Sequence, residues 1–220
     1  MLYENRVRTL LEPFELRLTS SQVGQTLTYL DLLLRWNSKI NLTSVRSEEE
    51  CVTRHFGESL FLARWIQLSG NLLDIGSGAG FPGLALRIVF PELSTTLLEP
   101  VAKKRAFLKE VARACAIRSV EVRPERLEDF SRLSAASTFD TVTVRAVGHL
   151  DEIVPQAIKS LMPGGRICLW LSRNQGLALK ESASSIQWTE PIKIPISSER
   201  EIWVGTREPM LTGSVVQPGR

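Results

Sequence analysis

The stretch that decides the fold runs from Leu72 to Gly83 and reads LLDIGSGAGFPG. Its apolar start, Leu72 to Ile75, is typical of a buried strand. The glycines that follow let the backbone turn sharply and leave no Cβ in the way of a ligand. Pro82 then suits the first turn of a helix. Because ligands of open α/β sheets lie at the carboxyl ends of the strands, we expect a ligand at this turn.

The chain after this turn continues to alternate short apolar runs with helical stretches. Predicted strands cover 72–75, 94–99, 119–123, 141–145 and 166–171, and predicted helices cover 82–89, 103–115, 125–130 and 150–161. Strands that alternate with helices of about ten residues indicate right-handed βαβ units in a mostly parallel sheet. Two last runs, 191–196 and 201–207, flank a short polar turn, and we expect them to form a hairpin at one edge of the sheet.

The first part of the chain has a helical pattern instead. Apolar side chains recur every three or four residues over 20–36, which places them on one helical face. A second predicted helix starts at Ser47, whose spacing to Glu50 is that of a capping box, and runs to about residue 66. The sequence therefore predicts a helical cap (1–69), a cofactor-binding α/β domain (70–207) and a loose tail (208–220).

Composition excludes several classes of protein. With 43% hydrophobic and 23% charged residues among 220, the chain is typical of a globular protein and not of a disordered one. No apolar run reaches the ~18–20 residues that span a bilayer, and the N-terminus lacks a secretory signal pattern. The net charge of +3 permits a nucleic-acid partner without requiring one. Three widely spaced cysteines, Cys51, Cys115 and Cys168, predict free thiols. We expect a cytoplasmic monomer with no membrane contact and no metal.

Two kinds of ligand compete for the glycine-rich turn. The register from Gly78 to Gly83 matches the dinucleotide fingerprint, but it starts two residues late and places Pro82, which has no N–H, where a pyrophosphate needs donors. Asp74 at the strand's end repels a pyrophosphate and attracts an ammonium group. Glu99, at the end of the next strand, can accept hydrogen bonds from both hydroxyls of a ribose. The pair, with the glycines, predicts S-adenosylmethionine; the alternative is that Asp74 only caps a turn and Glu99 only faces solvent.

Four motifs in sequence order resemble one known family. They are WNSKINLTSVR (36–46), RHFGES (54–59), DIGSGAGFPGLALRIVFPE (74–92) and FDTVTVRAVGHLDEIVPQAIKSLMPGG (139–165). On these motifs the chain resembles the bacterial small-subunit ribosomal RNA guanine-N7 methyltransferases, the RsmG or GidB family. The resemblance implies an α/β fold with a seven-stranded, Rossmann-like sheet, and S-adenosylmethionine as methyl donor. It further implies 16S rRNA or the small ribosomal subunit as partner, with 7-methylguanosine in the decoding region as product.

The resemblance also implies which residues contact the cofactor. The matching positions are Gly76, Gly78 and Phe81 in the turn, Leu127 and Glu128 after the third strand, and Arg145 at the end of the fourth strand. Asp74 and Glu99 keep the cofactor-binding roles that their chemistry suggests.

On the substrate side the resemblance implies roles for Arg145, Arg54 and His55. The guanidinium of Arg145 suits guanine O6 or a phosphate, although an ion pair that only holds the strand end is the alternative. Arg54 and His55 line an RNA pocket in one interpretation. In the other, Arg54 forms a helical i,i+4 pair with Glu58, and His55 only packs.

The chain departs from the family pattern at two places on this side. Many members have an aspartate where this chain has Glu58, and the longer arm leaves its geometry open. The family often has a lysine after the fifth strand, where residues 171–174 read LSRN, so Arg173 is the candidate replacement.

Guanine N7 carries a lone pair and no proton, so its methylation requires placement and a dry site and no general base. Two other classes of function remain open from the sequence. One is a methyltransferase of a substrate other than RNA, and the other is a non-catalytic RNA- or ribosome-binding module that keeps the fold. A dinucleotide-dependent oxidoreductase is the least consistent with the turn.

Overall fold

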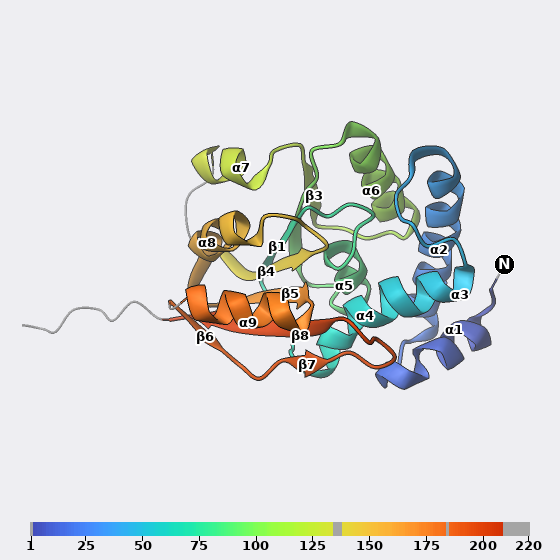
Figure 1. The fold of residues 1–220 in the computed structure, drawn as a ribbon. Coiled ribbons are helices and arrows are strands. Elements are labelled where there is room, and N and C mark those ends of the chain that lie inside the picture. The colour runs from blue at the N-terminus through green and yellow to red at the C-terminus, as the bar shows by residue number, and fades with distance from the viewer. Residues whose placement is uncertain (1, 134–137, 184, 209–220) are drawn as a thin grey trace, which may run out of the picture.

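A computed structural model of the protein describes residues 2–133, 138–183 and 185–208, and it has one central β-sheet with helices on both faces (Figure 1). The strands are β1 (Asn71–Ile75), β2 (Ser94–Leu98), β3 (Val120–Arg123), β4 (Phe139–Arg145), β5 (Leu161–Leu171), β6 (Ile186–Trp188), β7 (Ile192–Lys193) and β8 (Glu201–Arg207). The sheet order is β3-β2-β1-β4-β5-β8-β6, with β7 paired to β8 as well. Each of the seven predicted runs thus contains a strand, and β6 is a further strand that was not predicted.

The strand order places a binding crevice next to the glycine-rich turn. Strands β1 to β5 pair in parallel, whereas β8 pairs antiparallel with each of its neighbours β5, β6 and β7. From β1 the chain first builds outward through β2 and β3, and then returns to pair β4 with the other side of β1. This reversal is a topological switch point, where open α/β sheets leave a crevice at the carboxyl ends of the strands.

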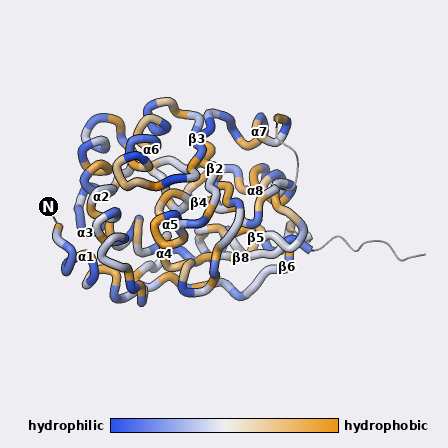
Figure 2. Tube along the Cα trace, turned by 180° about the vertical axis from the view of Figure 1, so that it is seen from behind, coloured by the Kyte–Doolittle hydropathy of each residue, from blue (hydrophilic) through white to orange (hydrophobic). Residues whose placement is uncertain are grey.

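The helices cover the two faces of the sheet in two groups. They are α1 (Glu4–Leu11), α2 (Ser20–Ile40), α3 (Glu48–Cys51), α4 (Glu58–Leu60), α5 (Gly83–Val89) and α6 (Ala102–Ala114) on one face, and α7 (Leu127–Leu133), α8 (Leu150–Ser160) and α9 (Arg173–Ser182) on the other. Each face of the sheet forms its own hydrophobic core with the helices that cover it. Because side chains alternate along a strand, Trp170 of β5 packs into the core on the side of α1–α6, and its neighbour Leu169 packs into the core on the side of α7–α9. Figure 2 shows hydrophobic stretches gathered along the central strands and α5, with hydrophilic stretches on the outer turns.

The N-terminal helices share one hydrophobic core with the first face of the sheet. Helix α2 begins with a capping box, in which Thr19 accepts from the Gln22 amide and the Gln22 side chain accepts from the Thr19 amide. Its apolar face, which includes Val23, Leu30 and Leu33, is buried as the periodicity predicts. The cap therefore packs directly beside the turn that follows β1, through its contacts with α5 and α6.

The second predicted helix is correct in extent but not in regularity. Residues 48–64 form α3, a π-helical segment η2 (Val52–Gly57), α4 and a 3₁₀ segment η3 (Phe61–Arg64) in succession. Ser47 supplies only half of the expected capping box: its hydroxyl accepts the Glu50 amide at 3.5 Å, while the Glu50 carboxylate pairs with Arg54 instead. Single-turn π-helices concentrate at functional sites, and this one carries Arg54 and His55.

The C-terminal part differs from the prediction in two respects. The predicted hairpin of β7 and β8 forms. However, β8 lies inside the sheet between β5 and β6, so the last strand in the sheet order is β6. Helix α9, with its Ser172–Gln175 capping box, was not predicted. The predicted loose tail falls, beyond residue 208, outside the described residues.

Cys51, Cys115 and Cys168 are free thiols, as expected, and all three are buried. Burial raises the pKa of Cys168 to about 12, so this thiol is an unreactive part of the core. Within the described ranges, no helix has both the length and the apolar character needed to cross a membrane. Within the same ranges, no cluster of His, Cys, Asp and Glu has a metal-binding arrangement.

Candidate cofactor and RNA site

The turn after β1 is built by glycines in conformations that other residues rarely adopt. Gly76, Gly78 and Gly80 have φ values of +68°, +55° and +89°. A Cβ on Gly76 would lie 2.7 Å from Val147, in the loop after β4. The Ser77 amide donates to the carbonyl of Leu98 at the end of β2 (3.0 Å), which ties the turn to the neighbouring strand. The turn is thus a fixed backbone surface and not a loose connection.

Asp74 lies beneath this turn and is buried. One carboxylate oxygen accepts the hydroxyl of Thr143 on β4 (2.7 Å), while Oδ2 has no hydrogen-bond partner among the described residues. Gly83 packs so closely on it that a Cβ there would collide with the Asp74 side chain. Burial raises the pKa of Asp74 to about 6. Asp74 does not line the cavity described next, so its charge reaches a ligand only through the turn.

Glu99 stands on the opposite side of the turn, just after β2. Its Oε2 accepts the Gly78 amide (2.9 Å), and its Oε1 accepts the Val101 amide (2.8 Å). Each carboxylate oxygen keeps a second lone pair, and Glu99 lines the cavity. A ribose with two hydroxyls therefore fits the chemistry of this carboxylate, as the sequence suggested.

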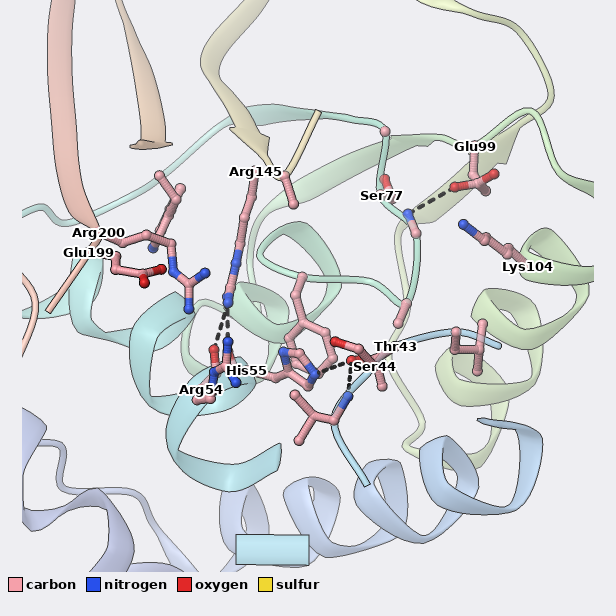
Figure 3. Close-up of a pocket in the computed structure, with 18 of the residues that line it drawn as sticks. Thr43, Ser44, Arg54, His55, Ser77, Glu99, Lys104, Arg145, Glu199 and Arg200 are labelled. Atoms are coloured by element: carbon pink, nitrogen blue, oxygen red, sulfur yellow. Dashed lines mark hydrogen bonds between the residues drawn. The ribbon is translucent and has the colours of Figure 1, made fainter. Parts of the chain in front are cut away.

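A cavity of about 560 Å³ opens beside the turn and joins segments that are far apart in the sequence. Its walls come from the loop after α2, from η2, from the glycine-rich turn, from the ends of β4 and β5, and from the β7–β8 turn, as Figure 3 shows. Of the predicted site residues, those that line it are Arg54, His55, Gly76, Gly78, Phe81, Glu99 and Arg145. Leu127 and Glu128, on α7, lie outside this lining, as does Asp74.

Arg145, at the end of β4, both holds the structure together and lines the cavity. Its guanidinium donates to the Glu58 carboxylate (2.9 Å), the Ser59 hydroxyl (2.8 Å) and the Arg54 carbonyl (2.6 Å). Its side chain is only 8% exposed, and this burial lowers the pKa to about 10, so it remains a cation at neutral pH. The two interpretations of Arg145 are therefore compatible: its ion pair positions η2, and its side chain still faces the cavity.

Glu58 has a fixed geometry despite its longer arm. It accepts from Arg145 on one side and from two nitrogens of Arg200 on the other, both at 3.0 Å. The Trp170 indole donates to its backbone carbonyl (2.8 Å). The alternative helical pair with Arg54 does not form, because Arg54 pairs with Glu50 (2.7 Å). Glu58 thus joins β4 and the β7–β8 turn through two arginines.

Arg200 is the main site residue that the sequence analysis missed. It lies in the polar turn before β8, 142 residues from Glu58, and no local pattern marks it. The proposed replacement cation, Arg173, is 65% exposed, pairs with Glu201 at 3.5 Å and does not line the cavity. Lys104 of α6 is another basic lining residue, and it belongs to the Lys103–Arg105 run.

His55 forms part of the cavity wall and also packs. One ring nitrogen lies 2.8 Å from the hydroxyl of Thr43, and the ring stacks on Phe81 with centroids 5.0 Å apart. Burial, together with the cations Arg145, Arg54 and Arg200, lowers the pKa of His55 to about 3. The imidazole is therefore neutral at physiological pH.

Several solved structures share this fold. Ribosomal protein L11 methylase from Lactobacillus delbrueckii subsp. bulgaricus matches with a TM-score of 0.58 at 14% identity, over 70% of this chain and 79% of that one. A fibrillarin/Nop5p complex matches with a TM-score of 0.57 at 14% identity, over 69% and 82%. At such identities the likeness shows the fold alone. Fold and site together define a Rossmann-like α/β protein with a ligand cavity at the carboxyl ends of its parallel strands.

Sequence relatives define the family. A family model described as GidB, rRNA small subunit methyltransferase G, matches residues 22–201. Ribosomal RNA small subunit methyltransferase G of Chloroflexus aggregans is 37% identical over 199 residues, 86% of this chain and 84% of that protein. The protein of that name from Syntrophotalea carbinolica is 33% identical over 214 residues, 94% and 99% of the two chains. The chain belongs to the GidB family, which confirms the resemblance seen in the motifs.

Proposed function

We propose that this protein methylates N7 of a guanine in 16S rRNA, with S-adenosylmethionine as methyl donor. One observation carries the proposal: a single cavity joins the glycine-rich turn and Glu99 to the basic side chains of Arg54, Lys104, Arg145 and Arg200. Family membership and the names of the relatives support RNA of the small ribosomal subunit as substrate. The more specific proposal, that N7 is the atom that is methylated, rests on the sequence motifs that resemble the family.

The cofactor would lie against the turn. The backbone of Gly76 and Gly78 offers close approach, Glu99 would accept the ribose hydroxyls, and Phe81 closes the wall on the cap side. When bound, S-adenosylmethionine supplies an electrophilic methyl group on a sulfonium. Asp74 lies beneath the turn and would attract the cationic amino-acid arm of the cofactor by its charge, without direct contact. Contacts of Leu127 and Glu128 with the adenine stay a prediction from the family resemblance.

The wall opposite the turn suits a guanine taken out of an RNA strand. Guanine in RNA is recognised after its base leaves the stack, by hydrogen bonds to its edges and by contacts to phosphate. Arg145 and Arg200 are held in place by the shared carboxylate of Glu58. The terminal nitrogens of Arg145 donate to four protein acceptors, whereas Arg200 uses Nε and Nη2 for Glu58, so Nη1 of Arg200 is the donor that suits a guanine edge or a phosphate. Arg54, in contrast, is 46% exposed at the rim, where it can meet a phosphate.

The chemistry that we propose needs no proton transfer from the base. The N7 lone pair would form the new bond to the methyl carbon as the bond from that carbon to the sulfonium sulfur breaks, with neutral S-adenosylhomocysteine as the leaving group. The task of the protein is therefore placement and exclusion of water. His55 is neutral and hydrogen-bonded to Thr43, and it adds no charge to repel the cationic product base. We therefore propose positioning roles for Arg54 and Arg145 and a wall-forming role for His55. We also propose a monomer that acts on ribosomal RNA in the cytoplasm.

The test is a methyl-transfer assay with labelled S-adenosylmethionine and the purified protein. Small ribosomal subunits and 16S rRNA from cells that lack this protein serve as substrates, and tRNA and ribosomal proteins serve as controls. The expected result is label in 16S rRNA that elutes as 7-methylguanosine after nuclease digestion. Label only in protein or tRNA would support the methyltransferase of another substrate and refute this proposal. RNA binding without any affinity for S-adenosylhomocysteine would support the non-catalytic module.

A further inference from the structure

Tyr29 of α2 lies where the helical cap meets the glycine-rich turn. Its side chain is fully buried, and its hydroxyl donates a hydrogen bond to the carbonyl of Ala79 (2.5 Å), 50 residues further along the chain. Ala79 is one of the residues that line the cavity. Burial raises the pKa of the Tyr29 hydroxyl well above its usual value, so the group remains a donor. The cap therefore holds a backbone atom of the cofactor turn directly.

The ring of Tyr29 supports the same turn a second time. Phe81 lies between Tyr29 and His55, with ring centroids 5.2 Å from the tyrosine and 5.0 Å from the histidine and interplanar angles of 12° and 23°. Phe56 of η2 meets both Tyr29 and Phe81 edge-on, at 5.2 Å and 5.0 Å. Phe81 and His55 form part of the cavity wall. The stack thus runs from the core of the cap to the surface of the site.

The position of Tyr29 leaves no room for a side chain at Gly80, the third glycine of the turn. Gly80 has φ +89°, and a Cβ on it would collide with the Tyr29 hydroxyl oxygen. The absence of a side chain at Gly80 therefore allows the cap to approach the turn. Glycines lose more conformational freedom than other residues when they become ordered, so a turn that holds three of them is costly to fix unless other groups anchor it.

We infer that Tyr29 is a positioning residue for cofactor binding, which holds the glycine-rich turn in its binding conformation through Ala79 and Phe81. The inference rests on the proposed function, because the ligand concerned is S-adenosylmethionine. Preorganisation of this kind acts on affinity, since the ordering cost is met before the ligand arrives. Tyr29 does not line the cavity, so it acts only through the turn and the stack.

The test compares Tyr29→Phe with Thr26→Val. The first change removes the bond to Ala79 and keeps a ring for the stack. Thr26 is the matched control: it lies on the same helix, is fully buried, and donates its hydroxyl to the Gln22 carbonyl (2.8 Å), away from the turn. Calorimetric titration with S-adenosylhomocysteine is expected to give an affinity about five- to tenfold weaker for Tyr29→Phe, the effect of one lost buried hydrogen bond. Thr26→Val is expected to bind within about twofold of the wild type.

A second readout uses the protein without ligand. Amide hydrogen exchange in a peptide that covers residues 76–84 is expected to be faster in Tyr29→Phe and unchanged in Thr26→Val, because only the first variant frees the turn. In the methyl-transfer assay, the KM for S-adenosylmethionine should rise in Tyr29→Phe while kcat stays constant. A merely structural role would lower the stability of both variants and leave KM alone.

Wild-type affinity and wild-type exchange in Tyr29→Phe would overturn the inference, and so would an equal loss of affinity in Thr26→Val. Wild-type protein that does not bind S-adenosylhomocysteine at all would refute the proposed function instead. The two failures are therefore distinguishable.

Discussion

The cofactor side and the substrate side of the cavity are built in different ways. The cofactor side comes from one short stretch, residues 76–99, which holds the glycine-rich turn and Glu99, with Asp74 buried beneath the turn. The substrate side is assembled from η2, the end of β4 and the β7–β8 turn, through contacts that span 87 to 142 residues. Its shape depends on side chains and on the buried carboxylate of Glu58.

The difference has consequences for energy and specificity. A glycine turn at a strand end is a general solution for a nucleotide-like ligand, and it needs few long-range contacts. A buried carboxylate that serves two arginines is costly to desolvate, and it stabilises the fold only while both partners are present. Changes on the substrate side should therefore disturb stability and turnover together, while changes on the cofactor side should act on affinity for the cofactor.

The largest expected effect comes from Glu58→Ala, which leaves Arg145 buried without its counter-ion. We expect a loss of about 3–5 kcal/mol in the free energy of unfolding, measured by urea denaturation. The matched control is Glu50→Ala, which removes the exposed partner of Arg54, and it should cost less than about 0.5 kcal/mol. Similar losses for the two variants would contradict the distinction between a buried bridge and a surface pair.

On the cofactor side, Glu99→Gln should weaken S-adenosylhomocysteine binding roughly 10- to 100-fold, because charged acceptors make stronger hydrogen bonds than neutral ones. Stability should fall by about 1–3 kcal/mol as well, since the amide oxygen can accept only one of the two backbone donors and the other is left without an acceptor. Glu121→Gln, at a carboxylate on β3 that is 60% exposed, is the control and should bind as the wild type does. Isothermal titration measures both, and an unchanged affinity in Glu99→Gln would remove Glu99 from the site.

Arg200→Gln should impair the substrate side of the cavity and leave the cofactor side unchanged. We expect kcat/KM for the RNA substrate to fall about tenfold through the loss of one charged contact, while the affinity for S-adenosylhomocysteine stays at the wild-type value. Arg173→Gln provides the control, because this exposed arginine does not line the cavity. If Arg173→Gln lost turnover and Arg200→Gln did not, Arg173 and not Arg200 would be the arginine that contacts the RNA substrate.

The smallest expected effect concerns pH. His55 has a folded pKa of about 3 against an ordinary value of 6.5, so protons favour the unfolded chain and stability falls as pH drops through 6.5. Asp74 has a folded pKa of about 6 against 3.8, so protons favour the folded chain and stability rises as pH drops from about 6 to 4. The two trends oppose each other in the wild type.

In His55→Gln only the trend of Asp74 remains, so the change in Tm from pH 7 to pH 5 should be more positive than in the wild type. Asp74→Asn should shift this change in the opposite direction. Thermal unfolding at the two pH values measures both variants. The same pH dependence in all three proteins would show that neither group titrates as described.

The cofactor side was predictable because its causes are local: the turn and Glu99 follow from strand-end glycines and a strand-end carboxylate, and the Rossmann-like sheet follows from alternating strands and helices. Arg54, His55 and Arg145 also line the cavity, but they were predicted only from the family resemblance, and Asp74 lies beneath the turn and outside the cavity lining.

The interruption of the second helix by η2 was not predictable from apolar spacing, which continues across it. Arg200 could not be predicted, because its role comes from a tertiary contact with Glu58. The same applies to Tyr29, which the helical pattern shows only as one residue of α2.

The most direct test of the central claim is mass mapping of modified nucleosides in 16S rRNA from cells with and without this protein. One 7-methylguanosine in the decoding region should be missing from the 16S rRNA of cells that lack the protein. It should return with a wild-type copy, but only weakly with Arg200→Gln. An identical 7-methylguanosine map in the two kinds of cell would contradict the claim that this cavity joins a cofactor to a ribosomal guanine.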